Sequence, residues 1–252
     1  MNGQSLDGVD HRTHRAPSPP ERPLDEAYER GHEDAVSVIT GLCREMYRHG
    51  WVTGTGGGIS VRQGDTVYMA PSGVQKERLR REDIFVLDRS GAVRHRPPNT
   101  ALRVSQCCPL FMHAFQMRNA GACIHTHSQA AVLATLLPPT VAAGEFRMTH
   151  QEMIKGVPQH GYHDTLVVPV IDNTAQEEQL AASMAAAMRA YTRAPAVLVR
   201  RHGLYVWGRD YVQAKTVNEC LDYLFEVACR MHAMGIDHTQ VPPDCAECRQ
   251  PK

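Results

Sequence analysis

The sequence predicts an α/β fold: one domain with a mixed sheet and helices on its faces. Short apolar runs of strand length are interspersed with segments whose apolar residues recur at helical spacing. Several of the strands are separated only by Gly and Ser-Gly turns, which join neighbouring strands tightly. The 252 residues suffice for a full-sized core, and neither a composition break nor an internal repeat marks a boundary.

The N-terminal third predicts a polar leader, one helix and three strands. Residues 1–23 carry four prolines among polar residues without periodicity, and we expect a disordered leader there. The domain is expected over 24–238, with a flexible tail at 239–252. A helix begins near Glu33 and ends at Gly50, which supplies a stop signal. Its apolar residues are Ala35, Val38, Ile39, Leu42, Cys43 and Met46, and strands follow at 58–61, 66–70 and 84–87.

The rest of the chain alternates between strands and helices. Pro109 opens one helix at a position where proline is tolerated. Thr174 followed by Glu177 has the spacing of a capping box and predicts the start of another. Strands are expected at 120–124, 165–171, 196–199 and 204–207, and helices at 108–118, 130–137 and 210–234.

The overall charge excludes several classes of partner. Lys plus Arg and Asp plus Glu each number 27, so bulk charge attracts the chain neither to nucleic acid nor to an acidic membrane. No apolar stretch approaches the roughly 20 residues that span a bilayer. The N-terminus shows no apolar signal segment, so we expect a soluble, cytoplasmic protein.

The eight cysteines do not suggest a disulfide framework. Four of them lie within apolar patterns, where a free thiol behaves as a small buried hydrophobe: Cys43, Cys123, Cys220 and Cys229. Cys245 and Cys248 have the spacing of half a zinc site, but no second pair of suitable spacing exists. We therefore expect no metal in the tail.

Three histidines form a candidate metal site. His125 and His127 follow an apolar strand, and because residues two apart share a face of a strand, their imidazoles project together. His202 follows a second apolar strand and joins them if the two strands lie side by side. Three imidazoles with an open fourth position suit a catalytic divalent metal, zinc by preference.

Two loops form a candidate phosphate pocket. The segment 53–60 has four glycines in five positions, so its backbone is able to approach a ligand and bind an anion through N–H groups. It lacks the lysine and following helix of a nucleotide-binding phosphate loop, which excludes a nucleoside triphosphatase. A mobile turn is the alternative. Ser72 and Gly73, followed by Lys76, offer a second flexible backbone and a hydroxyl.

Glu152 and Cys107 are candidates for chemistry, each with a simpler alternative. In a partly desolvated cleft the pKa of Glu152 would rise towards that of a general acid or base; otherwise it is a surface residue paired with Lys155. Cys107 precedes a helix, whose dipole lowers the pKa of a thiol. Because the histidines look committed to metal, we expect Cys107 to line the pocket or lie near the metal, or else to serve packing.

Five ordered motifs resemble one family over about residues 30–238: GWVTGTGGGIS at 50–60, APSGVQKER at 70–78, IHTHS at 124–128, THQEMIKG at 149–156 and VLVRRHG at 197–203. The family is that of the methylthioribulose-1-phosphate dehydratases of methionine salvage, in the class II aldolase and adducin-head superfamily, and the wording is closest to the eukaryotic branch. The resemblance implies a homotetramer of three-layer α/β/α subunits, each with a mixed, largely antiparallel sheet.

The resemblance also implies roles for single residues. His125, His127 and His202 would bind one zinc ion per subunit, and Glu152 would be the catalytic acid/base. Cys107 stands where sugar-phosphate aldolases of the superfamily have a glutamate, a departure that counts against aldol cleavage. Cys108 beside it receives no role.

The implied reaction converts 5-methylthioribulose 1-phosphate to 5-methylthio-2,3-dioxopentyl phosphate. Cys107 and the two loops would contact this small phosphorylated sugar through Gly56, Gly57, Ser72, Gly73 and Lys76. A class II sugar-phosphate aldolase is one alternative. A non-catalytic interaction module like the adducin head is another, although such a module needs neither the three histidines nor Glu152.

Overall fold

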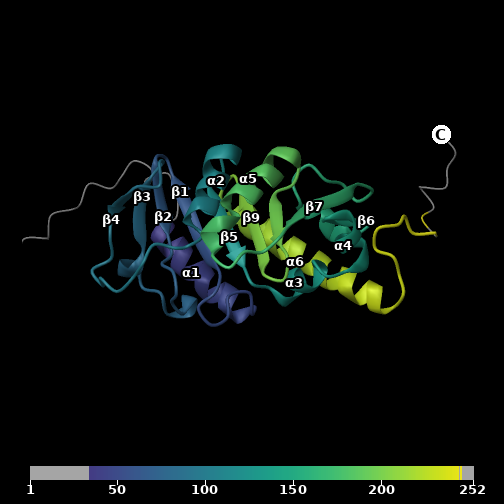
Figure 1. Cartoon of the computed structure of the whole chain (residues 1–252), viewed down its shortest axis with the longest axis horizontal. Coiled ribbons are helices and arrows are strands. Elements are labelled where there is room, and N and C mark those ends of the chain that lie inside the picture. The colour runs from purple at the N-terminus through teal and green to yellow at the C-terminus, as the bar shows by residue number, and fades with distance from the viewer. Residues whose placement is uncertain (1–33, 244, 246–252) are drawn as a thin grey trace, which may run out of the picture. The chain divides into compact units, whose positions relative to one another are not determined.

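The fold is built on one nine-stranded sheet. In the computed structural model, the structure describes residues 34–243 and residue 245, so the expected leader and Cys248 lie outside the described residues. The strand order is β4-β3-β2-β1-β5-β9-β8-β7-β6, and of the neighbouring pairs only β7 and β8 are parallel. The predicted mixed sheet with flanking helices is confirmed (Figure 1).

The elements follow one another as the periodicities predict, with a few additions. The strands are β1 Gly58–Gln63, β2 Thr66–Met69, β3 Phe85–Asp88, β4 Val93–His95, β5 Ala122–Thr126, β6 Glu145–Thr149, β7 Thr165–Ile171, β8 Ala196–Val199 and β9 Gly203–Gly208. The α-helices are α1 Ala35–Arg48, α2 Cys108–Arg118, α3 Gln129–Ala134, α4 Pro138–Ala143, α5 Ala181–Ala190 and α6 Tyr211–Ala233. Two 3₁₀ turns, η3 Glu152–Gly156 and η4 Glu177–Leu180, matter for the site.

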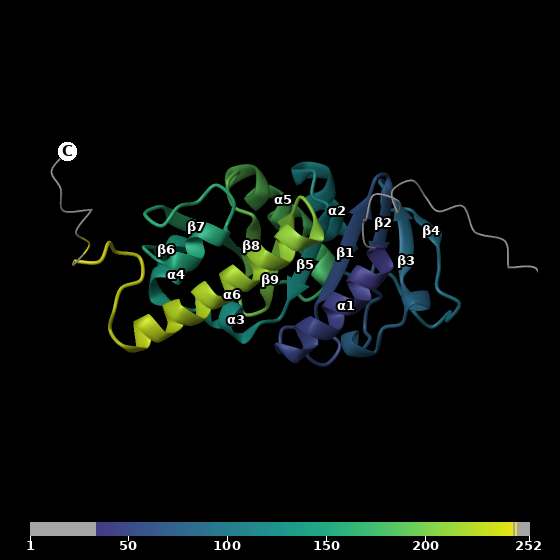
Figure 2. The same ribbon diagram turned by 180° about the vertical axis from the view of Figure 1, so that it is seen from behind.

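Helices cover both faces of the sheet because its central strands are apolar on both sides. Ile124 of β5 and Leu204 of β9 join one core cluster with α1 and α6, while Cys123 and Tyr205, their neighbours in sequence, join the other with α2 and α5. Figure 2 shows α1 and α6 lying over the first face. This gives the three layers that the resemblance implies.

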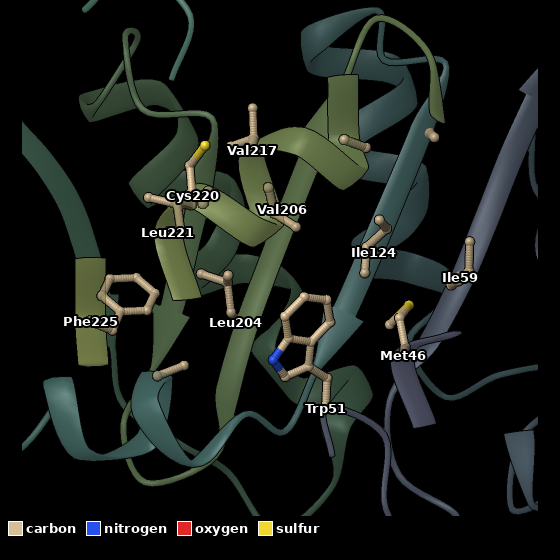
Figure 3. Packing of buried hydrophobic residues seen from close by; sticks show 14 of the residues in the cluster. Met46, Trp51, Ile59, Ile124, Leu204, Val206, Val217, Cys220, Leu221 and Phe225 are labelled. Carbon is tan, nitrogen blue, oxygen red and sulfur yellow. The ribbon is translucent and has the colours of Figure 1, made fainter. Parts of the chain in front are cut away.

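The long helix α6 packs across one face of the sheet. Asp210 caps it by accepting a hydrogen bond from the Gln213 amide. Leu221 and Phe225 lie beside Leu204 of β9 in the core (Figure 3). The helix is thereby fixed against the central strands.

The capping box predicted at Thr174 is wrong. The Thr174 hydroxyl donates to the Gln176 carbonyl, and the α-helix of this region begins only at Ala181. Glu177 does not cap a helix either, because its carboxylate accepts a hydrogen bond from Tyr205 and contacts His125. Within the described residues, no helix combines the length and apolar character that crossing a bilayer requires.

The topology gathers three strand ends at one edge of the sheet. Strands β7 and β8 are parallel, and β5 has the same direction because both β5 and β8 pair antiparallel with β9. Their carboxyl ends therefore face the same way. His125 and His127 lie at the end of β5, His202 directly after β8, and η4 after β7.

Candidate metal centre

The structure brings the three predicted histidines together. Nε2 of His127 lies 3.0 Å from Nε2 of His125 and 3.0 Å from Nε2 of His202. Two nitrogen ligands of a tetrahedral zinc ion are about 3.3 Å apart, given a metal–nitrogen distance near 2.05 Å. The three imidazoles are thus arranged around one point.

Hydrogen bonds behind the rings orient two of these histidines. Nδ1 of His125 donates to the Leu204 carbonyl at 3.0 Å, and Nδ1 of His202 donates to the Asn173 side-chain oxygen at 3.0 Å. Each bond places the proton on Nδ1 and leaves the lone pair on Nε2, which faces the cluster. A ligating histidine usually has such a second partner. The His125 ring also stacks on Tyr205, with 4.0 Å between centroids.

A fourth side chain, Glu177, completes the cluster. Its Oε1 lies 2.9 Å from Nε2 of His125 and 3.7 Å from Nε2 of His202. In the described part of the chain, donor atoms of Glu177 and the three histidines lie within 4.8 Å of one another and could hold a metal ion. Sequence reasoning missed Glu177 because its spacing from Thr174 suggested a helix cap. Its position just beyond the apolar strand β7, at the edge where the histidines lie, was the available signal.

The electrostatics suit metal binding near neutral pH. Burial, reinforced by the neighbouring imidazoles, lowers the pKa of His127 to about 3, and burial together with His125 lowers that of His202 to about 4. Burial alone would raise the pKa of Glu177, but its contact with His125 and hydrogen bonds from Tyr205 and Cys107 prevail and hold it well below its usual range. Near neutral pH His127 and His202 are therefore neutral and Glu177 is ionised, the forms in which these side chains bind a divalent ion.

The glycine loop lies directly against β5, the strand that carries His125, and against His127. A Cβ at Gly56 would come 2.3 Å from Nδ1 of His127, and one at Gly57 would come 2.8 Å from the His125 carbonyl oxygen. Gly57 also has φ +68°, which other residues rarely adopt. Close approach is thus a structural reason for these glycines.

Lys76 contacts the same loop through its side chain. Its side chain is buried, and Nζ donates to the Thr55 carbonyl at 3.0 Å and to the Val74 carbonyl at 3.1 Å. Burial lowers the pKa of this lysine. Ser72, on the connection after β2, forms an isolated β-bridge with Arg103. Gly73 beside it has φ +65°. The structure therefore joins the glycine loop to the Lys76 segment.

The expectation of a lowered thiol pKa at Cys107 is wrong. Cys107 precedes α2, but its side chain is buried, and burial together with the charge of Glu177 raises the pKa of the thiol to about 12. The thiol hydrogen-bonds to Glu177, so Cys107 lies next to the cluster as a neutral group. Desolvation exceeds the helix dipole here.

Glu152 is not part of the cluster within one chain. In its own chain its side chain is 72% exposed and forms an ion pair with Lys155 at 2.6 Å, so within one chain the pairing alternative is observed and Glu152 lies outside a desolvated cleft. Thr149, three residues earlier, pairs with the first residue of β7, whereas Val199, next to the His202 turn, pairs with the last. These ends of β7 are about 20 Å apart at 3.3 Å per residue.

Comparisons with known proteins agree with this geometry. Residues 37–229 match the profile of the Class II Aldolase and Adducin N-terminal domain family. A methylthioribulose-1-phosphate dehydratase of Osmerus mordax is 56% identical over 214 residues, covering 82% of this chain and 88% of that protein. The enzyme of that name from Homo sapiens is 54% identical over 212 residues, covering 81% and 86%.

Solved structures share the fold at much lower identity. An L-fuculose 1-phosphate aldolase superposes with a TM-score of 0.67 at 22% identity, covering 84% of this chain and 92% of that one. YgbL of Escherichia coli, a putative aldolase/epimerase/decarboxylase, gives a TM-score of 0.65 at 16% identity, covering 85% and 97%. At these identities the likeness concerns the fold alone.

Proposed function

Because the chain belongs to the class II aldolase and adducin N-terminal domain family, and within it to the methylthioribulose-1-phosphate dehydratases, we propose that it removes water from 5-methylthioribulose 1-phosphate. The observation that carries the proposal is the identity of 50–56% to curated dehydratases, combined with three imidazoles directed at one point. The enzyme is thus a carbon–oxygen lyase, and we assign its reaction to methionine salvage.

The donor set fits a divalent metal. His125, His127 and His202 would hold one ion per chain, with zinc favoured by three imidazoles and a nearby carboxylate. When bound, such an ion supplies a Lewis acid that acidifies the hydrogen next to the substrate carbonyl. Glu177 contacts Nε2 of His125, whereas Leu204 accepts a hydrogen bond from Nδ1 on the other side of the ring. The Glu177 carboxylate also keeps negative charge beside the three histidines.

The reaction balances without a further reagent. Carbon 3 of the sugar loses its hydrogen as a proton, and the hydroxyl on carbon 4 leaves after accepting a proton, which releases water. The resulting enol returns a proton to carbon 4 and becomes the 2,3-diketone, 5-methylthio-2,3-dioxopentyl phosphate. The protein must therefore supply a proton donor at the carbon 4 hydroxyl, and we assign this role to Glu152.

If Glu152 donates this proton, it must come from a second subunit. In its own chain, Glu152 follows the end of β6, which lies beside the first residue of β7. His202 lies near the last residue of β7, at the other end of that strand. We propose a homotetramer in which Glu152 of one subunit faces the histidines of another. The exposure of Glu152 supports this arrangement, because a side chain reaching into a neighbour must project from its own surface.

The glycine loop and the Ser72 segment would bind the 1-phosphate. Gly56 and Gly57 bring backbone close to His127 and His125, while Gly73 keeps the second loop turned. The ammonium of Lys76 lies beneath Thr55 and adds positive charge to the loop. The described cysteines are all free, which supports a reducing compartment, and we propose the cytoplasm.

The decisive experiment is Glu152→Gln with metal content held equal to wild type. Loss of a general acid should lower turnover of methylthioribulose 1-phosphate about 10²- to 10⁴-fold while the metal stays bound. Glu82→Gln, which removes another charge from an exposed ion pair with Arg80, is the matched control and should leave turnover unchanged. Near-normal turnover in the Glu152 variant would remove this residue from the mechanism.

Aldol cleavage is the second candidate, favoured by one observation: Glu177 brings a carboxylate to the histidines although Cys107 stands where aldolases have one. Incubation with fuculose or rhamnulose phosphate, with detection of a released aldehyde, distinguishes the two reactions. Protein that is metal-free after purification without chelators would instead favour a non-catalytic interaction module.

A further inference from the structure

A second group of metal-binding side chains lies at the β6 edge of the sheet, four strands away from β5 in the strand order. His150 directly follows β6, His163 shortly precedes β7, and Cys245 comes from the chain beyond α6. Among the described residues, donor atoms of these three side chains lie within 4.8 Å of one another. None of them belongs to the centre described above.

His150 is held in a fixed position and tautomer. It is 6% exposed, and its φ of +54° is a left-handed conformation that is unfavourable for a non-glycine residue. The Thr149 hydroxyl donates to the Asp164 carbonyl at 3.0 Å, so it accepts from Nδ1–H of His150 at 2.9 Å. The lone pair is therefore on Nε2, as in His125.

The two rings are disposed like the pairs of the first cluster. The centroids of His150 and His163 are 5.2 Å apart with an interplanar angle of 74°. The three pairs among His125, His127 and His202 have centroids 4.7–5.0 Å apart and angles of 71–78°. The His150–His163 pair therefore has the same kind of relative ring orientation as the three pairs of the first cluster.

The donor types of this second cluster suit zinc. Thiolate and imidazole are ligands that zinc accepts readily in proteins. A search for a second cysteine pair fails along the sequence because the donors that accompany Cys245 are histidines, from positions about 80 to 95 residues earlier.

We propose that His150, His163 and Cys245 bind a second zinc ion. The site joins the segment after α6 to the β6–β7 connection, which also carries η3. It is independent of the proposed dehydration, since it lies at another part of the sheet and uses different ligands. The expectation of a metal-free tail is replaced by this assignment.

Metal content of the full chain, purified without chelators, tests the proposal. Wild type should hold two zinc ions per chain, and Cys245→Ser, His163→Ala and His125→Ala should each hold one. His160→Ala is the matched control, because this nearby histidine lies outside the cluster and should leave two ions bound. One ion in wild type with none in His125→Ala would overturn the proposal. Two ions in both Cys245→Ser and His163→Ala would overturn it as well.

Cobalt substitution gives a second readout that does not depend on activity. The His125→Ala chain loaded with Co²⁺ should retain a thiolate-to-cobalt charge-transfer band in the near ultraviolet, and adding Cys245→Ser should abolish it. The two variants together separate the tail site from the first cluster. Absence of the band in His125→Ala, or a band that persists after Cys245→Ser is added, would overturn the proposal.

Discussion

Glu177 shows how single contacts define the metal centre. Its carboxylate accepts a hydrogen bond from Tyr205, interacts with the Cys107 thiol, and lies 2.9 Å from His125. These partners come from three separate parts of the chain. Glu177 therefore contacts side chains from the start of α2, from β5 and from β9.

Replacing Glu177 by Gln should weaken metal binding. The change removes negative charge beside His125 but keeps the shape of the side chain, so affinity for zinc should fall about 10- to 100-fold without unfolding. Titration of the metal-free protein with zinc measures this. The neighbouring exposed residue provides a control, since Glu178→Gln should bind zinc as wild type does. Equal affinity in both variants would show that Glu177 does not support the metal.

Cys107 should resist alkylation in the folded protein. With a thiol pKa of about 12, roughly one molecule in ten thousand carries the thiolate at pH 8, and only the thiolate reacts. Mass spectrometry after iodoacetamide treatment should find Cys107 unmodified in the native chain and modified in denaturant. Rapid native modification at pH 8 would contradict the burial described here.

The sequence predicts the site where local spacing carries the information. The separation of two between His125 and His127 places both imidazoles on one face of any strand, and the apolar run before His202 identifies its partner strand. Glu177 has no such local pattern, because its role depends on where β7 ends relative to β5. The thiol of Cys107 was misjudged since burial depth depends on tertiary packing.

At the scale of elements, the glycine loop and β5 depend on each other. Gly58 of β1 pairs with His125, and the loop before it approaches His127 at Gly56. A larger side chain in the loop would displace His127 rather than the residues of the hydrophobic core.

Gly56→Ala should therefore lower metal affinity more than stability. The new methyl group would displace the His127 ring, since its Cβ would lie 2.3 Å from Nδ1. Gly41→Ala is the control, because nothing lies within 4 Å of a Cβ there, and it should raise stability by about 0.5–1 kcal/mol as an alanine in a helix. Zinc titration and chemical denaturation measure the two effects, and unchanged zinc affinity in Gly56→Ala would contradict the described contact.

The long helix α6 is predictable from the sequence, whereas the short edge strand β6 is not. The 23 residues of α6 repeat their apolar positions over six turns, whereas β6 has five residues at the edge of the sheet. One helix was expected over 130–137, but α3 ends at Ala134 and Pro138 begins α4. Proline disfavours the helical conformation in the residue before it, which divides the segment.

At the scale of the whole molecule, the separation of Glu152 from the histidines predicts complementation. Glu152→Gln and His125→Ala chains should each be inactive alone, but mixed tetramers would contain sites with an intact residue of each kind. Random assembly of equal amounts gives such sites roughly one quarter of the time, since each subunit contributes a surface to its neighbours. Activity after joint refolding measures this. No recovery would indicate that both residues act within one chain.

The distance in sequence between the ligands has a thermodynamic consequence. His127 and His202 are 75 residues apart, so only the paired strands β5, β9 and β8 hold their imidazoles together. Zinc should therefore bind the folded state far more tightly than the unfolded one, and mass action adds about 2.7 kcal/mol to stability when free zinc is 100 times its dissociation constant. The melting temperature of this protein should then rise with the concentration of free zinc. The metal supply would thereby set the fraction of the protein that is folded at a given temperature.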